Sequence, residues 1–190
     1  MSLFAIRHGE TVWSRSGQHT GTTDLPLTET GRQLAERLRP LLAKETFALV
    51  LVSPMRRACE TCGLAGFGDR AVVDPNLLEW NYGAYEGLTA REIDNRAPSW
   101  LIFRNGCPGG ETPQEVGLRV DRVIARVRAV SGDTVLFAHG HVLRVLAARW
   151  LGLSVSAGQH FVLDTGTVSV LGHYRDIPAV KIWNSPAALQ

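Results

Sequence analysis

Leu3-Phe4-Ala5-Ile6-Arg7-His8-Gly9-Glu10-Thr11 is the stretch that decides how this chain folds. Its apolar residues predict a buried strand over 3–7, close to the start of the chain. The strand ends with an arginine and a histidine side by side, and at Gly9 we expect a sharp turn that a side chain would strain. A guanidinium and an imidazole at the carboxyl end of a strand suit phosphate chemistry. The competing interpretation is a strand that simply ends in polar residues, and the rest of the chain decides between the two.

The composition predicts an ordinary globular protein. The 190 residues fit one domain, 1–190, and a hydrophobic fraction of 45% with a charged fraction of 20% allows a real core. The net charge of +2 does not by itself indicate a nucleic-acid or membrane partner. No apolar stretch approaches the roughly 18 residues of a membrane-spanning helix, and the apolar run before Arg7 is too short for a signal peptide. We therefore expect a cytoplasmic protein.

The cysteines do not predict a disulfide framework, because there are three of them. Cys59 and Cys62 form a Cys-x-x-Cys pair, which leaves a redox role open. A structural zinc site would need a second such pair, and only Cys107 remains. We interpret the pair as small, partly buried helix residues and expect no metal site.

Apolar periodicity and turn residues predict strands that alternate with helices. The loop over 11–26 is rich in Gly, Ser and Thr and is expected to be functional, and the aromatic, Gly-containing segment 76–87 is expected to be a loop. Thr28 is the expected cap of the first helix, and Ser53, followed by proline, that of the second. We expect strands at 3–7, 48–52, 71–73, 134–138, 161–163, 167–172 and 179–183, and helices at 31–42, from 53 onward, at 89–96, 112–130 and 141–150.

Such alternation predicts an α/β fold: a three-layer αβα sandwich with a mostly parallel central sheet. Ligands bind such sheets at the carboxyl ends of the strands. His8 and His139 each follow a predicted strand, so we expect both at that edge.

Four further segments accompany the first in order: Gly21-Thr22-Thr23-Asp24-Leu25-Pro26-Leu27-Thr28 with Gly31, Ser53-Pro54-x-x-Arg57-Ala58-x-x-Thr61, Glu79 with Tyr82-Gly83 and Glu86-Gly87, and Gly110-Glu111-Thr112 with Arg119 and then Ala138-His139-Gly140. Together they resemble the motifs of the histidine phosphatase superfamily, also called the phosphoglycerate mutase-like family. The resemblance implies the phosphoglycerate mutase-like fold and a phosphatase that needs neither cofactor nor metal.

The resemblance also implies roles for individual residues. His8 is the expected nucleophile, and Arg7, Arg57 and His139 the expected clamp on the transferring phosphoryl group. Glu79 is the expected general acid, and later the base that activates water. The residues expected to contact phosphate or substrate are Arg7, Ser14, Thr20, Gly21, Arg57, Tyr82, His139, Gly140 and His141.

Elementary chemistry supports this scheme. Hydrolysis of a phosphate monoester is extremely slow without a catalyst, and a covalent intermediate splits it into two easier transfers. An acceptor at the other ring nitrogen should fix the tautomer of His8 so that Nε2 attacks. Glu79 has to hold a proton, which the charge of a bound phosphate would favour, although a local cap or ion pair is its alternative role. Glu86 and Glu111 are interpreted as structural and Glu10 as orienting the site.

Several positions depart from the cofactor-dependent mutases of the family. Ser14 stands where they carry asparagine, Ala90 where they carry lysine, and His141 where they carry asparagine. The segment between Glu79 and His139 is also shorter, which predicts a more open site that admits water. Hydrolysis is therefore favoured over return of the phosphoryl group.

The sequence is most similar to the sedoheptulose-1,7-bisphosphatase-like branch, through Trp13–Gly21, Leu78–Gly87, Gly106-Cys107 and Phe137–His141. This implies a small phosphorylated substrate, a sugar phosphate or bisphosphate, with inorganic phosphate as product. A bisphosphate would need a second cationic patch, for which Arg15, His19, Arg104 and His141 are candidates. A phosphoglycerate mutase and a non-catalytic phosphate-binding module remain as alternatives. We expect no nucleic-acid or membrane partner, and a homodimer stays open.

Overall fold

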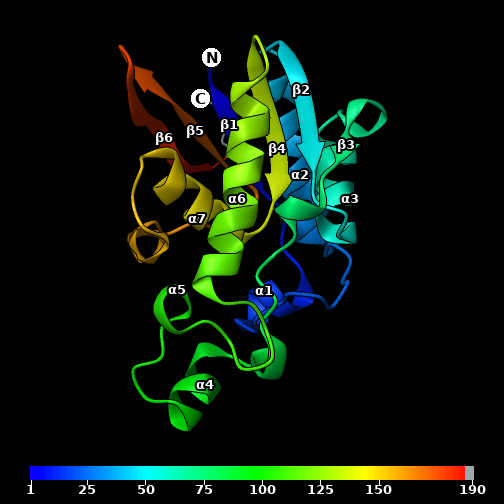
Figure 1. The fold of residues 1–190 in the computed structure, drawn as a ribbon. Helices are drawn as coiled ribbons and strands as arrows, with labels where there is room; N and C mark the ends of the chain where they lie inside the picture. Colours follow the sequence, from blue (N-terminus) through cyan, green and yellow to red (C-terminus); the bar gives the residue numbers. More distant parts are fainter. Residues whose placement is uncertain (187–190) are drawn as a thin grey trace.

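The computed structural model describes residues 1–186 and is built on one six-stranded sheet (Figure 1). The strand order is β3-β2-β4-β1-β5-β6. The first four of these are parallel, while β5 and β6 are antiparallel to their neighbours. The expected mostly parallel sheet is thus confirmed. The strands are β1 (Leu3–Arg7), β2 (Phe47–Val52), β3 (Val72–Val73), β4 (Asp133–Ala138), β5 (Thr167–Tyr174) and β6 (Ile177–Pro186).

Two pairs of helices cover the two faces of the sheet (Figure 1). α2 (Glu29–Leu42) and α3 (Arg56–Leu64) lie on one face, and α6 (Pro113–Arg128) and α7 (Gly140–Trp150) on the other. Successive side chains of a strand point to opposite faces, so a strand contributes side chains to the hydrophobic cores on both faces of the sheet. In β1, Leu3 and Ala5 pack with residues of α6 and α7, whereas Ile6 packs with residues of α2 and α3. This is the predicted three-layer sandwich.

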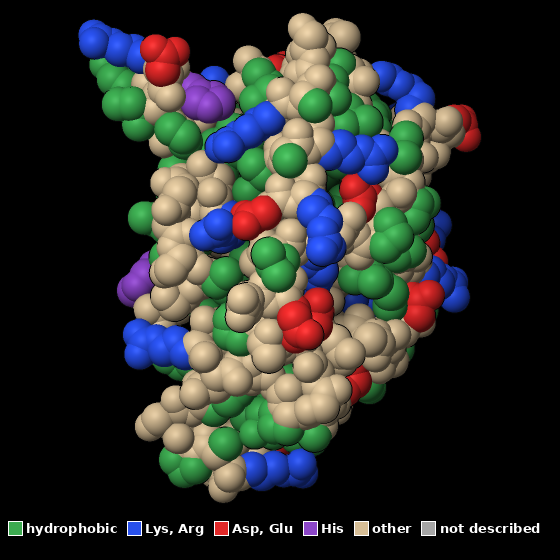
Figure 2. Space-filling view, viewed as in Figure 1, with side chains coloured by type: hydrophobic (Ala, Val, Ile, Leu, Met, Phe, Trp, Pro, Cys, Tyr) green, Lys and Arg blue, Asp and Glu red, His purple; other side chains and the backbone are tan. Residues whose placement is uncertain are grey.

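Short elements gather at the carboxyl ends of the parallel strands (Figure 1). These are the helices α1 (Val12–Ser16), α4 (Ala90–Arg96) and α5 (Ile102–Asn105). Short 3-10 helices span Gly68–Arg70, Pro75–Leu77, Gly83–Tyr85 and Val155–His160. On the face that carries α6, basic and acidic side chains are interspersed (Figure 2), in keeping with the small net charge. Within residues 1–186, no helix is both long and apolar enough to cross a membrane.

Most predicted elements are present with shifts of a few residues at their ends. The strand at 3–7 has the predicted bounds, and Thr28, Thr89 and Thr112 cap the helices that follow them. At Thr89 and Thr112 the cap is reciprocal, because a glutamate three residues on accepts from the cap's backbone N–H.

Three predictions of secondary structure are wrong. The loop over 11–26 contains α1, which a reciprocal cap between Thr11 and Ser14 stabilises. The helix α5 was not expected, and the predicted strand at 161–163 is irregular.

Ser53 does not cap the second helix. α3 begins at Arg56, and its cap residue is Met55, whose own side chain makes no capping hydrogen bond. Instead, the hydroxyl of Ser53 lies 2.7 Å from Nε2 of His139. The N–H of Arg56 is satisfied by the Asp24 carboxylate, at 2.8 Å.

Gly9 is needed for a different reason from the one predicted. Its φ is not in the left-handed region, so no backbone strain is avoided. A Cβ at Gly9 would instead lie 2.3 Å from the carbonyl oxygen of Gly31, and one at Gly31 would lie 2.1 Å from that of Glu10. The two glycines let the start of α2 pack directly against the segment that carries His8.

The cysteines are free thiols. Cys59 and Cys62 both lie on α3. Burial raises the pKa of Cys62 and of Cys107 to about 12, so both are protonated and poorly reactive at neutral pH.

Candidate active site

Three neighbouring parallel strands end side by side at the centre of the sheet. Val52 of β2 pairs with Phe137 of β4, and Arg7 of β1 pairs with Ala138. The residues that follow the strands, Ser53, His139 and His8, are therefore placed in a row. The rings of His8 and His139 lie 5.1 Å apart between centroids. The sheet thus brings together the two histidines that the sequence placed at this edge.

His8 is held in one tautomer. Its Nδ1 lies 2.7 Å from the carbonyl oxygen of Gly9, which can only accept, so Nδ1 carries the proton and Nε2 keeps its lone pair. Burial and the charges of Arg57 and Arg7 hold the pKa of His8 well below the ordinary 6.5. At neutral pH the ring is an uncharged base with a free Nε2, the form that a nucleophile requires.

Thr61 ties the segment of His8 to the helix of Arg57. Its hydroxyl accepts from the N–H of Gly9 at 3.0 Å and donates to the carbonyl of Arg57 at 2.7 Å. The spacing Arg57-Ala58-x-x-Thr61 is one helical turn, which allows this bond. The threonine of the motif therefore positions two expected catalytic residues at once.

Arg57 is fully buried and its guanidinium is almost completely engaged. Nε donates to Nδ1 of His139 at 3.0 Å, Nη1 to the carbonyl of Thr23, and Nη2 to those of Thr20 and Gly21. One N–H of Nη1 is left without a partner among residues 1–186. Glu86 shapes this loop, because its carboxylate accepts from the N–H groups of Gly21 and Thr23.

Arg7, unlike Arg57, has a guanidinium nitrogen that lacks a hydrogen-bond partner. It contacts the carbonyl of Leu163 and packs against Gly140, where a Cβ would lie 3.3 Å from its Cζ. Its Nε is buried and has no hydrogen-bond partner within the described chain. An unpaired buried donor is costly, so an anion that pairs with it would be bound favourably.

Glu79 lies against the first turn of α7. Oε1 accepts from the N–H groups of Trp80 and Val142, both at 2.9 Å, and Oε2 accepts from that of His141 at 3.0 Å. Glu79 therefore caps the first turn of α7, the alternative role that the sequence left open. The same bonds place the carboxyl group at the cavity that His8 also lines.

An ion pair fixes the segment that carries Glu79. Nε and Nη2 of Arg119 donate to the two oxygens of Glu111, at 2.7 and 3.0 Å. Nη1 and Nη2 of the same guanidinium reach the carbonyls of Leu78 and Glu79. Glu111 is thus structural, as predicted, and it acts through Arg119.

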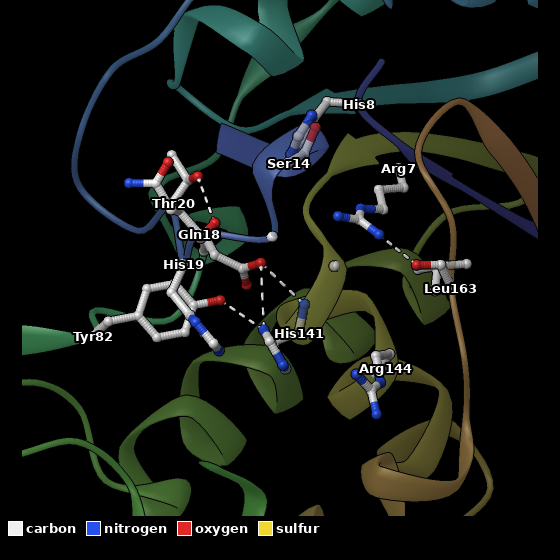
Figure 3. Close-up of a pocket in the computed structure, with 13 residues that line it drawn as sticks. Arg7, His8, Ser14, Gln18, His19, Thr20, Tyr82, His141, Arg144 and Leu163 are labelled. Carbon is white, nitrogen blue, oxygen red and sulfur yellow. Dashed lines mark hydrogen bonds and ion pairs between the residues drawn. The ribbon is translucent and has the colours of Figure 1, made fainter. Parts of the chain in front are cut away.

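A cavity opens in front of these groups (Figure 3). Side chains from β1, α1 and α7 point into it, among them Arg7, His141 and Arg144. It is lined by Arg7, His8, Ser14, Gly17, Gln18, His19, Thr20, Glu79, Tyr82, Gly140, His141, Arg144 and Leu163. No group of three or more His, Cys, Asp or Glu side chains within residues 1–186 is arranged to hold a metal ion.

Comparison with known proteins agrees with this geometry. Residues 3–186 match the model of the histidine phosphatase superfamily, branch 1. The chain belongs to that superfamily. It is 40% identical to an acid phosphatase of Mycobacterium tuberculosis over 174 residues, which are 90% of this chain and 85% of the relative. It is also 40% identical to sedoheptulose 1,7-bisphosphatase of Saccharomyces cerevisiae over 183 residues, 79% of this chain and 67% of that protein.

A solved structure shows the same fold. It is that of an open reading frame product from Mycobacterium tuberculosis, with a TM-score of 0.94 and 35% identity over 98% of both chains. The predicted phosphoglycerate mutase-like fold and the predicted class, a phosphoric monoester hydrolase of the histidine phosphatase type, are confirmed. A covalent phosphohistidine is the general mechanism of this superfamily.

Three of the expected contact residues of this histidine phosphatase do not line the cavity. Arg57, His139 and Gly21 lie behind its wall, engaged with one another and with the loop before α2. Ser14 does line it, but its hydroxyl is used in the cap of α1, where it accepts from the N–H of Thr11 and donates to the carbonyl of the same residue.

The structure adds contact residues that the sequence analysis missed: Gly17, Gln18, Arg144 and Leu163. The place of Arg144 could have been inferred from the sequence, because it lies one helical turn after Gly140 and thus on the same face of α7. Of the four candidate residues for a second cationic patch, His19 and His141 line the cavity, whereas Arg15 and Arg104 are exposed and do not.

Tyr82 and His141 form an uncharged pair in the cavity wall. The phenol oxygen lies 2.6 Å from Nδ1 of His141. Burial and the charge of Glu79 raise the pKa of Tyr82 well above its ordinary value. Burial, Arg144 and His19 lower the pKa of His141 well below 6.5. His141 is therefore a hydrogen-bonding group at neutral pH and does not add a cation.

Proposed function

We propose that the protein hydrolyses small phosphomonoesters, with His8 as the nucleophile that becomes phosphorylated. The observation that carries this proposal is the bond between Nδ1 of His8 and Gly9, which leaves a neutral imidazole with a free Nε2 at the cavity. Nε2 attacks phosphorus in line, a P–N bond forms, and the bond from phosphorus to the ester oxygen breaks.

Arg7, Arg57 and His139 bind the phosphoryl oxygens in this scheme. Arg7 has its unpaired Nε, and Arg57 has one free N–H on Nη1. Donors that reach the three equatorial oxygens in the complex stabilise the charge that spreads over them in the transition state. The first turn of α7 contributes its N-terminal dipole to the same group.

Glu79 supplies the proton that the leaving oxygen needs. In the second step, the resulting carboxylate takes a proton from water, the water oxygen attacks phosphorus, and the P–N bond breaks to release inorganic phosphate. The same carboxyl group thus serves first as acid and then as base, and ends each cycle protonated as it began.

The substrate we propose is a sugar phosphate or sugar bisphosphate. A second compartment adjoins the cavity and shares His19, His141 and Arg144 with it. Its walls include the rings of Trp100 and Phe103, which suit the apolar face of a sugar ring. Arg144 is the cation at the junction, since its guanidinium packs 4.5 Å from the centroid of Phe103.

Two measurements test the proposal. Purified protein is assayed without added metal against phosphorylated sugars, 2- and 3-phosphoglycerate and nucleotides. The enzyme is then quenched during turnover of a ³²P-labelled substrate. We expect hydrolysis and an acid-labile, base-stable label, which His8→Ala abolishes and the distant His173→Ala retains. Label on His8→Ala, or interconversion of the phosphoglycerates in place of hydrolysis, would overturn the proposal.

A further inference from the structure

Ser53 is a buried polar residue to which the mechanism has so far given no task. It directly follows β2, its side chain is inaccessible to solvent, and its N–H donates to the carbonyl of Phe137 at 2.9 Å. That bond continues the pairing of β2 with β4 and places the hydroxyl beside His139. The strand register therefore holds Oγ 2.7 Å from Nε2 of His139.

The direction of this hydrogen bond is fixed by Arg57. A guanidinium only donates, so Nδ1 of His139, 3.0 Å from Nε of Arg57, is an acceptor and carries no proton. The proton of the neutral ring is then on Nε2, and Oγ of Ser53 accepts it. The other contact of this oxygen, from the N–H of Met55, is long at 3.4 Å.

This arrangement leaves His139 without a proton for the phosphoryl group. Nε2–H is used by Ser53, and Nδ1 is occupied by Arg57. When substrate binds, the Nε–H of Arg57 can turn to a phosphoryl oxygen, which frees Nδ1. The ring can then donate from Nδ1 only if it takes up a second proton there while Nε2–H stays satisfied.

We propose that Ser53 is a positioning residue for His139: its hydroxyl oxygen accepts the Nε2 proton in the free and in the substrate-bound enzyme, so that the ring donates from Nδ1 to the phosphoryl group as an imidazolium. This rests on the proposed function. The second proton comes from solvent as the substrate dianion enters and returns when phosphate leaves, and no covalent bond of Ser53 changes.

The positive charges around His139 disfavour its protonation, so the hydrogen bond that Ser53 accepts from Nε2 is needed to stabilise the imidazolium. Arg57 donates to Nδ1 of His139, the ring of His8 lies 5.1 Å away, and the charges of Arg119 on α6 and Arg7 on β1 also act on it. Burial and these groups hold the pKa of His139 well below 6.5, so the free ring is neutral. A phosphate dianion opposes the cations, and an acceptor at Nε2 favours the charged ring further. Loss of the acceptor lowers the pKa of His139 in the complex, so activity is lost at a lower pH.

Four variants test the proposal through the pH dependence of kcat. Ser53→Ala removes the acceptor, Ser53→Cys keeps the size with a weak acceptor, and Ser53→Thr keeps the hydroxyl. Thr134→Val is the control, because it removes another fully buried hydroxyl, on β4, that has no partner among residues 1–186. We expect kcat to fall about 100-fold in Ser53→Ala with KM little changed. In Ser53→Ala the fall of kcat at alkaline pH should also begin at a lower pH than in the parent enzyme, and Ser53→Cys should behave similarly. In Ser53→Thr and Thr134→Val the pH at which kcat falls should equal that of the parent enzyme.

A spectroscopic measurement makes the test independent of turnover. ¹⁵N NMR of the free protein should show His139 protonated on Nε2, with a slowly exchanging ring proton that Ser53→Ala loses and Thr134→Val retains. An unchanged alkaline limb in Ser53→Ala, or a resting proton on Nδ1, would overturn the proposal. Absence of phosphohistidine in the parent enzyme would instead refute the proposed function. If Ser53→Thr does not fold, the comparison of Ser53→Ala with Ser53→Cys and the NMR result still decide.

Discussion

The imidazole rings of His8 and His139 face each other at 5.1 Å, with their planes 60° apart. This follows from the pairing of Arg7 with Ala138, which brings the next residue of each strand to the same level. Burial, together with the charges of Arg57 and Arg7, lowers the pKa of both rings. The free site therefore holds two neutral imidazoles between two guanidinium groups, and its excess positive charge is arranged before the phosphate dianion arrives.

The two buried histidines of the site, together with the partly buried His141, should make the protein sensitive to mild acid. The folded-state pKa values of His8, His139 and His141 are all lowered well below 6.5, the value expected when unfolded. Below that pH the unfolded chain binds more protons than the folded one. The stability that these residues contribute is therefore complete above pH ~6.5 and is lost as the pH falls.

Urea denaturation in phosphate-free buffer measures this effect. Three protons taken up on unfolding give a slope of up to about 4 kcal/mol of unfolding free energy per pH unit between about pH 6 and 5. His141→Gln should reduce the slope by about one third. A free energy of unfolding that does not depend on pH in this range would contradict the assignment of three neutral rings.

Arg119 should be needed both for stability and for the placement of Glu79. Arg119→Met leaves the carboxylate of Glu111 without its partner and frees the carbonyls of Leu78 and Glu79. We expect a loss of about 3 kcal/mol in unfolding free energy and at least a tenfold lower kcat. Chemical denaturation and steady-state kinetics measure the two effects.

The control is another arginine–carboxylate pair with similar geometry. Nε of Arg149 lies 2.9 Å from Asp121, but both side chains are partly exposed. Arg149→Met should cost less than about 1 kcal/mol and leave kcat unchanged. Equal losses of unfolding free energy and of kcat in the two variants would show that the bonds from Arg119 to the carbonyls of Leu78 and Glu79 have no special role.

Gly31 should tolerate no side chain. In Gly31→Ala, the new Cβ meets the carbonyl of Glu10, which cannot move without shifting His8. We expect a loss of about 3 kcal/mol or more and a strongly reduced kcat. Gly63→Ala on α3 is the matched control, since nothing lies within 4 Å of its Cβ, and it should gain up to about 1 kcal/mol. A Gly31→Ala variant as stable as the parent would contradict the close packing of α2.

The sequence predicted the parts of this molecule that depend on local patterns. Strand 3–7, the threonine caps and the order of layers follow from apolar periodicity and from short-range hydrogen bonds. The position of His8 beside His139 follows from the sheet. The role of Ser53 could not be predicted, because Ser-Pro before a helix is also a cap signal, and only the register of β2 with β4 turns the hydroxyl toward His139. Gly9 was likewise misinterpreted, since its contact with Gly31 is tertiary.

Arg144 should be the cation that distinguishes bisphosphates from monophosphates. Its Nε and Nη2 are anchored to the carbonyls of Gly158 and Gln159, which leaves Nη1 without a hydrogen bond to residues 1–186, and Arg144 lines both compartments. Arg144→Gln should raise KM for a sugar bisphosphate about tenfold or more and change KM for the monophosphate much less. Arg15→Gln and Arg104→Gln, at exposed positions outside both compartments, should leave both KM values unchanged. An equal rise for both substrates in Arg144→Gln would instead place this guanidinium on the phosphoryl group that is transferred.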